Sequence, residues 1–206
     1  MRLALAAAAL TAAGVPAALP AQPAPTASVG APAPDFIAAD AAGRPVRLST
    51  FRGKTVVLEW NNPGCPFVKK HYDSGNMQRT QAAARRQDVV WLTINSGAPG
   101  KQGHMSGAQA AAFERSAGLQ ASHYLLDPRG VVGRLYGART TPHMYVIDAR
   151  GTLVYAGGID DRPTADAADI AGARNHVTAA LADLQANRPV AVATSRPYGC
   201  SVKYAA

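Results

Sequence analysis

The sequence predicts an α/β fold, with a mixed central β-sheet sandwiched between α-helices and an extended C-terminal tail. Two runs, 55–60 and 88–96, are strongly apolar, as expected for central strands that helices cover on both faces. Segments with the spacing of helices alternate with these strands. Residues 143–158 instead alternate along two strands around a turn, which is typical of an antiparallel hairpin. We expect this hairpin to close the sheet.

The N-terminus has the layout of a secretory signal peptide. A single positive charge at Arg2 precedes an apolar stretch, and small residues and prolines follow. Gly14 and Pro16 cut the apolar run short of the roughly 20 residues that a membrane span needs, so an uncleaved anchor is the less favoured alternative. We therefore expect a cleaved signal peptide over 1–21, a flexible leader over 22–33, and a periplasmic or secreted protein without a stable membrane span.

The expected elements of the first half lie in a regular order, within a single domain over 34–186. The chain of 206 residues is long enough for one domain with a sizeable core. In chain order we expect a turn at 40–43 between two short strands, a strand at 55–60, a helix over 66–87 with a break near Gly75, and a strand at 88–96.

The second half begins with a glycine-rich loop that leads into a capped helix. Ser106 and Gln109 have the spacing of a capping box, which predicts a helix through about Ala117. The remaining expected elements are a strand at 123–127, a short helix over 129–137, the hairpin with its turn at 148–151, helical spacing over 164–186, and an extended tail over 187–206.

The charge of the chain does not indicate a nucleic-acid partner. The formal net charge is +8, but the basic residues are scattered rather than gathered in one run. No aromatic ladder or nucleic-acid motif accompanies them, so we exclude DNA and RNA as expected partners. The charge instead favours solubility.

Cys65 lies where a strand ends and a helix is expected to begin. Pro66 suits the first helical position, because its missing N–H would have no partner there. Free backbone N–H groups and the positive end of the helix dipole stabilise a thiolate, and Lys69, Lys70 and His71 would add positive potential. The pattern predicts an activated, accessible thiol, and a small buried structural cysteine is the alternative.

A second element of the expected site is Thr141-Pro142, directly before a strong strand. A proline at such a joint is a candidate for a cis peptide bond that shapes a specific turn. The alternative is that Pro142 merely begins the strand.

The order of these elements resembles the thioredoxin fold. The stretches "GAPAPDF", "LSTFRGKTVVLEW" and "VIDARGTLVYAG" resemble the peroxiredoxin-like branch, the alkyl hydroperoxide reductase and thiol-specific antioxidant superfamily, over about residues 30–186. The stretches "NPGCPFVKKHY" and "GCSVKY" are similar to those of an exported subgroup of these proteins. The resemblance implies a thioredoxin-like redoxin in which Thr141 and Pro142 lie against Cys65 and present backbone groups to an extended substrate.

The chain departs from these relatives at three positions. Val68 stands where thioredoxins carry their second cysteine, and Asn62 stands where peroxiredoxins carry a threonine or serine. Pro142 stands where peroxiredoxins carry an arginine, and Arg139 is the nearest candidate to replace it. Asn62 and Lys69 would supply polar or positive surroundings for the thiolate.

Cys200, the other cysteine, could supply the missing second sulfur. The tail from Asn187 to Cys200 could span roughly 40 Å, enough to cross one face of the domain. Three alternatives remain open from the sequence. Cys200 could resolve a reversible disulfide with Cys65, it could form a permanent staple, or it could bridge two chains.

A metal site is a minor alternative. The chain has five histidines, and a copper site would need two or more of them beside Cys65, with Met77 and Met105 as further soft ligands. The expected fold places only His143 nearby from elsewhere in the chain. The histidines are His71, His104, His123, His143 and His176. We therefore expect no metal and no cofactor.

These observations predict an exported enzyme, a thiol-disulfide oxidoreductase or peroxiredoxin-like antioxidant protein. Cys65 and Cys200 are the expected catalytic residues, and Asn62, Thr141 and Pro142 are expected to contact the substrate. The expected partners are a thiol or disulfide protein or a small peroxide, together with an unidentified thiol reductant. The competing hypothesis is a non-catalytic thioredoxin-fold binding or structural module, in which the disulfide is a staple.

Overall fold

The computed structural model describes residues 26–205. The expected signal peptide over 1–21 and the first part of the expected leader, 22–25, lie outside the described residues.

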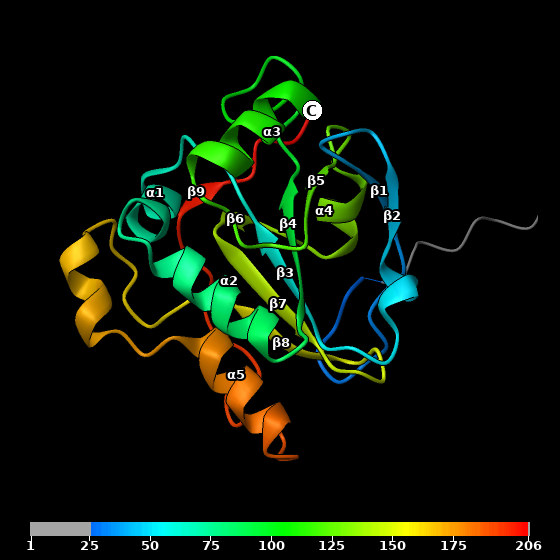
Figure 1. Ribbon diagram of the computed structural model, residues 1–206, viewed down its shortest axis with the longest axis vertical. Coiled ribbons are helices and arrows are strands. Elements are labelled where there is room, and N and C mark those ends of the chain that lie inside the picture. Colours follow the sequence, from blue (N-terminus) through cyan, green and yellow to red (C-terminus); the bar gives the residue numbers. More distant parts are fainter. Residues whose placement is uncertain (1–25, 206) are drawn as a thin grey trace, which may run out of the picture.

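A seven-stranded mixed sheet forms the centre of the fold (Figure 1). Its strand order is β2-β1-β5-β4-β3-β7-β8. β3 pairs in parallel with β4, β4 pairs in parallel with β5, and all the other pairings in this sheet are antiparallel. The strands are β1 Ile37–Asp40, β2 Pro45–Arg47, β3 Val56–Trp60, β4 Val90–Asn95, β5 His123–Leu126, β7 His143–Ile147 and β8 Leu153–Gly157. The predicted mixed sheet, its apolar central strands and its closing hairpin are confirmed.

Two hydrophobic cores lie on opposite faces of this sheet. On one face, Val57 and Trp91 pack with residues of α1 Pro66–Asp73, α2 Asn76–Arg86 and α5 His176–Gln185. On the other face, Leu58 and Trp60 pack with Phe36 and with α4 Val131–Leu135. The side chains of neighbouring strand residues point to opposite faces. Because both faces of β3 are covered, all five of its residues are apolar or hydrogen-bonded and buried.

The helices confirm most of the predicted boundaries. The predicted helix over 66–87 breaks at Gly75, which has a left-handed φ of 72° and lies between α1 and α2. The predicted capping box is present, since Ser106 Oγ accepts from Gln109 N and Gln109 Oε1 accepts from Ser106 N. It begins α3 Gly107–Ser116.

The helical pattern over 164–186 is only partly right, because the structure divides this stretch in two. A 3-10 helix η2, Ala167–Gly172, comes first, and Ala173 then adopts an extended conformation. Asn175 begins α5 by accepting a hydrogen bond from Thr178 N at 2.9 Å. Local caps therefore override the apolar spacing here. A second short 3-10 helix, η1 Leu48–Phe51, precedes β3.

The tail is extended, as predicted, and crosses the end of the domain near α1 (Figure 1). It forms a second, two-stranded antiparallel sheet in which β9 Cys200–Ser201 pairs with β6 Thr140–Thr141. This pairing was not predicted. It brings the C-terminal tail to the joint between β6 and β7, beside the start of α1.

We predict that Leu58→Ala lowers the free energy of unfolding by about 2–5 kcal/mol, because it leaves a cavity where the Leu58 side chain packs at the centre of the sheet. Leu58 has 0% exposure. Urea denaturation measures the loss. The matched control is Val131→Ala, at a side chain that is 57% exposed, and it should change stability by less than about 0.5 kcal/mol. Equal losses in the two variants would contradict this placement of the core.

Candidate functional site

The chain turns sharply between β3 and α1, and Asn62 shapes this turn. The Asn62 carbonyl accepts a hydrogen bond from Cys65 N at 2.9 Å, and its side-chain oxygen accepts from Gly64 N at 2.9 Å. Asn62 Nδ2 donates to Gln102 Oε1 at 2.9 Å. Asn62 is buried and holds the loop in place, and its predicted contact with substrate stays a prediction.

Cys65 is the N-cap residue of α1, with Pro66 at the first helical position, as predicted. Its side chain makes no capping hydrogen bond, so the sulfur is free to interact elsewhere. The Cys65 carbonyl accepts from Val68 N and Lys69 N, which begins the helix. In the thiol form, Cys65 Sγ donates to the Thr141 carbonyl at 3.1 Å. The peptide bond between Thr141 and Pro142 is cis.

The second cysteine comes to the same place through the tail. In the β6–β9 pair, Cys200 lies opposite Thr141, whose carbonyl contacts Cys65 Sγ, and each thiol shifts the pKa of the other. Both sulfurs are free thiols in this structure. Of the three arrangements that the sequence left open, this geometry favours pairing within one chain.

Gly199 permits the close approach of the tail. Its φ of +122° lies in a region that other residues rarely adopt. A Cβ at this position would lie 2.1 Å from the Thr141 carbonyl oxygen. Only glycine therefore lets the backbone pass this close to Thr141 and place Cys200 beside Cys65.

The two thiols have opposite pKa shifts. Burial by itself raises the pKa of Cys65, but the nearby Cys200 and Thr141 side chains and the backbone of Cys200 and Val68 favour the thiolate and together lower the pKa. Burial and the interaction with Cys65 raise the pKa of Cys200 to about 11. When the pair loses one proton, Cys65 therefore becomes the thiolate and Cys200 keeps its proton.

Cys65 is buried, whereas the sequence led us to expect an accessible thiol. Its exposure is 0%, and it packs within the core beneath α1, while Cys200 is partly exposed. The tail accounts for this difference, because β9 lies along β6 and covers the joint next to the sulfur. Cys65 is thus at the predicted helix start, but β9 of the C-terminal tail covers it.

The basic residues of α1 do not surround the thiol as predicted. Lys70 is buried, donates to the Arg162 carbonyl at 2.9 Å, and has its Nζ 3.8 Å from Asp160 Oδ2. Burial lowers the pKa of His71 to about 4, so this side chain is neutral near pH 7. Their charges are therefore balanced or absent, and only Lys69 remains exposed.

These two side chains instead anchor the tail through Tyr198. The Tyr198 hydroxyl donates to Asp160 Oδ1 at 2.5 Å and lies 3.3 Å from His71 Nε2. The Tyr198 ring meets the edge of Phe67, and the Lys70 ammonium lies 5.7 Å from its centroid. No local pattern in the sequence indicated this role of Tyr198, because its partners are far away in the chain.

A second residue that sequence analysis missed is Glu59, a carboxylate within β3 that is completely buried. Burial raises its pKa, and hydrogen bonds from its neighbours oppose this shift. Five side chains donate to it: Asn61, Tyr72, Gln81, Trp91 and Thr93. A charged residue within the apolar run "VVLEW" was a signal that could have indicated this network. The network ties α1 and α2 to the strands that support Cys65.

The remaining candidates do not form a second chemical centre. Arg139 is exposed, and its carbonyl accepts from Val202 N at 3.0 Å. Among residues 26–205, no three His, Cys, Asp or Glu side chains are grouped so that they could hold a metal ion. Within the same part of the chain, none of the helices has the length and apolar character that a membrane crossing requires.

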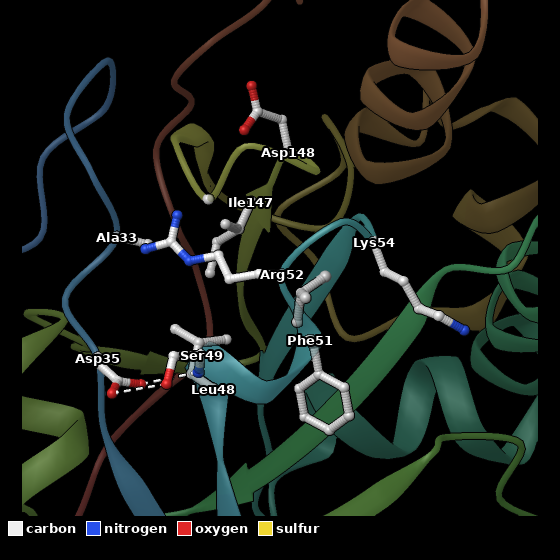
Figure 2. A pocket seen from close by; sticks show the side chains of 11 residues that line it. Ala33, Asp35, Leu48, Ser49, Phe51, Arg52, Lys54, Ile147 and Asp148 are labelled. Atoms are coloured by element: carbon white, nitrogen blue, oxygen red, sulfur yellow. Dashed lines mark hydrogen bonds between the residues drawn. The ribbon is translucent and has the colours of Figure 1, made fainter.

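A small pocket lies at the opposite end of β3 from Cys65 (Figure 2). Its lining includes Phe51, Arg52 and Ile147. The Asp35 carboxylate at its rim already accepts from Ser49 N at 2.9 Å and from Ser49 Oγ at 3.0 Å. The pocket brings no reactive group to the two sulfurs.

The fold and the paired sulfurs at the start of α1 define a thioredoxin-like redoxin. Residues 29–156 match the AhpC/TSA family, and the chain belongs to this family. Over 126 residues the chain is 28% identical to the thiol-disulfide oxidoreductase ResA of Geobacillus thermodenitrificans, in a match that covers 61% of this chain and 67% of ResA. The predicted family and the oxidoreductase class are confirmed. The exported subgroup stays a prediction.

Two solved structures resemble most of the chain. A hypothetical protein from Sinorhizobium meliloti 1021 has a TM-score of 0.74 and 24% identity, and the match covers 88% of this chain and 97% of that one. An uncharacterized conserved protein from Geobacillus kaustophilus has a TM-score of 0.71 and 26% identity, covering 86% of this chain and 93% of that one. These likenesses extend beyond the segment that matches the family.

We predict that Cys200→Ala raises the pKa of Cys65, because it removes the largest hydrogen-bond contribution to the stability of the thiolate. The rate at which Cys65 is alkylated follows its thiolate fraction. When the rates of each protein are divided by their plateau value at high pH, the pH profile of Cys200→Ala should therefore lie at higher pH than that of the wild type. Cys200→Ser keeps a donor hydroxyl and is the matched control, with a smaller move. An unchanged profile in Cys200→Ala would show that the Cys200 side chain does not stabilise the thiolate.

We predict that acidification destabilises the fold between about pH 6.5 and pH 4. Burial lowers the pKa of His71 to about 4 and that of His143 to about 3. The unfolded histidines take up protons first, near pH 6.5, so the unfolded state binds more protons in this window and stability falls as the pH falls. For His71 alone the loss is about 3 kcal/mol. Urea unfolding at several pH values measures it.

The variants for this measurement are His71→Gln and, as the control, Gln87→Ala. His71→Gln removes one of the buried histidines, so its stability should depend less on pH in this window than that of the wild type. Gln87 is exposed and carries no titratable group, so its replacement should leave the slope unchanged. The same slope in all three proteins would contradict the assignment.

Proposed function

We propose that this chain is a thiol-disulfide oxidoreductase whose Cys65 and Cys200 alternate between a dithiol and a disulfide. The single observation that carries the proposal is that Thr141 brings both cysteines together within one chain, since its carbonyl contacts Cys65 Sγ and it pairs with Cys200 in the β6–β9 sheet. Cys65 supplies the stabilised thiolate, and Cys200 supplies the second sulfur that Val68 does not provide. Thr141 and Pro142 position both, since the Thr141 carbonyl contacts Cys65 Sγ and Thr141 lies opposite Cys200.

The electron balance of this cycle is that of a two-electron exchange. When the pair is oxidised, one S–S bond forms between Cys65 and Cys200, two electrons leave, and the protons of the dithiol are released. A partner protein with a disulfide accepts these electrons, and a partner with two thiols returns them. The named relative, a thiol-disulfide oxidoreductase, supports this class of partner.

A small peroxide is the alternative oxidant. The Cys65 thiolate would attack one peroxide oxygen, break the O–O bond and become a sulfenic acid, and Cys200 would then displace hydroxide to form the disulfide. Membership of the AhpC/TSA family supports this route. The exposed Arg139 and the buried Asn62 stand against it, because neither is placed to polarise a peroxide at Cys65. We therefore favour thiol-disulfide exchange.

The site of action that suits this chemistry is an oxidising compartment. We propose that residues 1–21 direct export and are then removed, so that the domain over 34–186 and the tail over 187–206 act in the periplasm or outside the cell. The N-terminal sequence pattern supports this proposal. Disulfides form and persist in such a compartment. Exported proteins there could therefore exchange electrons with the Cys65–Cys200 pair.

The competing hypothesis makes the same two sulfurs a structural staple. The burial of Cys65 favours it, since buried cysteines are commonly inert. The lowered pKa of Cys65 and the partly exposed Cys200 favour a reactive pair. We therefore retain the redox function as the conclusion.

We predict that Cys65→Ser and Cys200→Ser each lower insulin reduction by more than about 100-fold, because each removes one of the two sulfurs that turnover requires. The assay follows insulin precipitation with dithiothreitol as the reductant, and peroxide consumption is measured in parallel. Ser201→Ala, at the exposed neighbour of Cys200, is the matched control and should keep full activity. Wild-type activity in both cysteine variants would refute the proposed function.

A further inference from the structure

Proteins that exchange electrons with this pair need access to one of its two sulfurs. The sequence indicated Cys65 as the sulfur that meets the partner. In the structure Cys65 has no exposed surface, whereas Cys200 is partly exposed. The structure therefore presents a different sulfur to the solvent.

The strand edge beside Cys65 is already occupied. An incoming extended peptide would have to pair with Thr140 and Thr141, but Ser201 and Cys200 pair with them instead. The Thr141 hydroxyl also lies 3.4 Å from the Cys200 carbonyl. A partner cannot use this edge to reach Cys65 while β9 is in place.

The tail is fixed on both sides of Cys200. Before it, Tyr198 is buried and donates to Asp160. After it, Val202 N donates to the Arg139 carbonyl at 3.0 Å, and the Tyr204 hydroxyl donates to the Ala138 carbonyl at 2.7 Å. These contacts hold the cover in position and hold Cys200 at one place on the surface.

There is space for a partner beside Cys200. A pocket that is open to solvent is lined by Thr140 and by the tail from Ser195 to Gly199, together with Asp161 and His176. It borders the residue that precedes Cys200. A partner that enters this pocket therefore reaches the tail next to Cys200, whose side chain is partly exposed.

We propose that the partner enters through Cys200 and that Cys65 is the leaving group, which reverses the roles expected from the position of Cys65 at the helix start. This inference rests on the proposed function. The partner is a protein with two thiols. Its first thiolate attacks Cys200 Sγ of the oxidised pair, a new S–S bond to Cys200 forms, the Cys65–Cys200 bond breaks, and its electron pair stays on Cys65 as a thiolate.

The second step returns the pair to the dithiol state. The second thiol of the partner, deprotonated, attacks the partner's own sulfur in the mixed disulfide, and Cys200 leaves and takes up a proton. The partner departs as a disulfide, so two electrons have moved to the pair. The lowered pKa of Cys65 makes it the better leaving group in the first step, in agreement with the geometry.

The test compares two full-length variants that each keep one cysteine. Cys65→Ser leaves Cys200, and Cys200→Ser leaves Cys65. Each reacts with a small pyridyl disulfide and with a pyridyl disulfide that carries a polyethylene glycol chain, and each rate is divided by the thiolate fraction from its pH profile. With the bulky probe we expect Cys200 to react at least about 10-fold faster than Cys65. Equal rates, or a faster Cys65, would overturn the inference.

A second pair of variants tests whether the tail is the cover. Gly199→Ala, combined with Cys200→Ser, forces the tail away from Thr141 because a Cβ has no room there. The bulky probe should then react with Cys65 at least about 10-fold faster. Gly172→Ala, combined with Cys200→Ser, is the matched control at a glycine with open space around it, and it should stay slow. No gain in the Gly199 variant would refute the role of the tail.

The proposed function fails on a different result. Mild oxidation of the wild type should join Cys65 and Cys200, which peptide mapping by mass spectrometry detects. If this bond does not form, the redox pair is refuted whatever the order of access. If it forms and the bulky probe prefers Cys65, the proposed function survives and the reversal of roles is wrong.

Discussion

The pairing of β9 with β6, which brings Cys200 beside Cys65, is the interaction on which the chemistry of this site depends. It places a sulfur near the end of the chain next to a sulfur at the first turn of α1. Gly199 makes it sterically feasible, because no other residue could pass so close to Thr141. The same contact lowers the pKa of one thiol and raises that of the other. The position of Cys200, the pKa values of the two thiols and the proposed role of Cys65 as the leaving group thus all depend on this contact.

The C-terminal tail both buries Cys65 and stabilises its thiolate, two effects that oppose each other in the pKa. A thiolate that is sealed from solvent loses hydration, which by itself disfavours the charged form. Donors from the tail and from the first turn of α1 replace the lost water, so Cys65 is buried and yet has a lowered pKa. Asp160, which anchors Tyr198, is a second buried charge that loses water. The Lys70 ammonium and the Tyr198 hydroxyl are its partners in place of that water. Buried charges in this half of the protein are paired or hydrogen-bonded.

Local signals explain what the sequence could predict and what it could not. Strands β3 and β4, the break at Gly75, the Ser106 cap and the position of Cys65 at the start of α1 follow from short-range patterns. The two-residue strands β6 and β9 are too short to show a periodicity, and they pair across 59 residues of sequence. The sequence shows which residues are basic but not which become buried, so Lys70 and His71 were misassigned. Access to Cys65 depends on the tail, and only the fold determines where the tail lies.

The reduction potential of the Cys65–Cys200 pair tests the central claim most directly. The protein is equilibrated with thiol and disulfide buffers of defined potential, and the fraction of joined sulfurs is measured by mass. A reversible pair that exchanges electrons with other proteins should titrate well above about −300 mV. A value at or below about −300 mV would show that the bond is a permanent staple, and it would contradict the account of a redox pair.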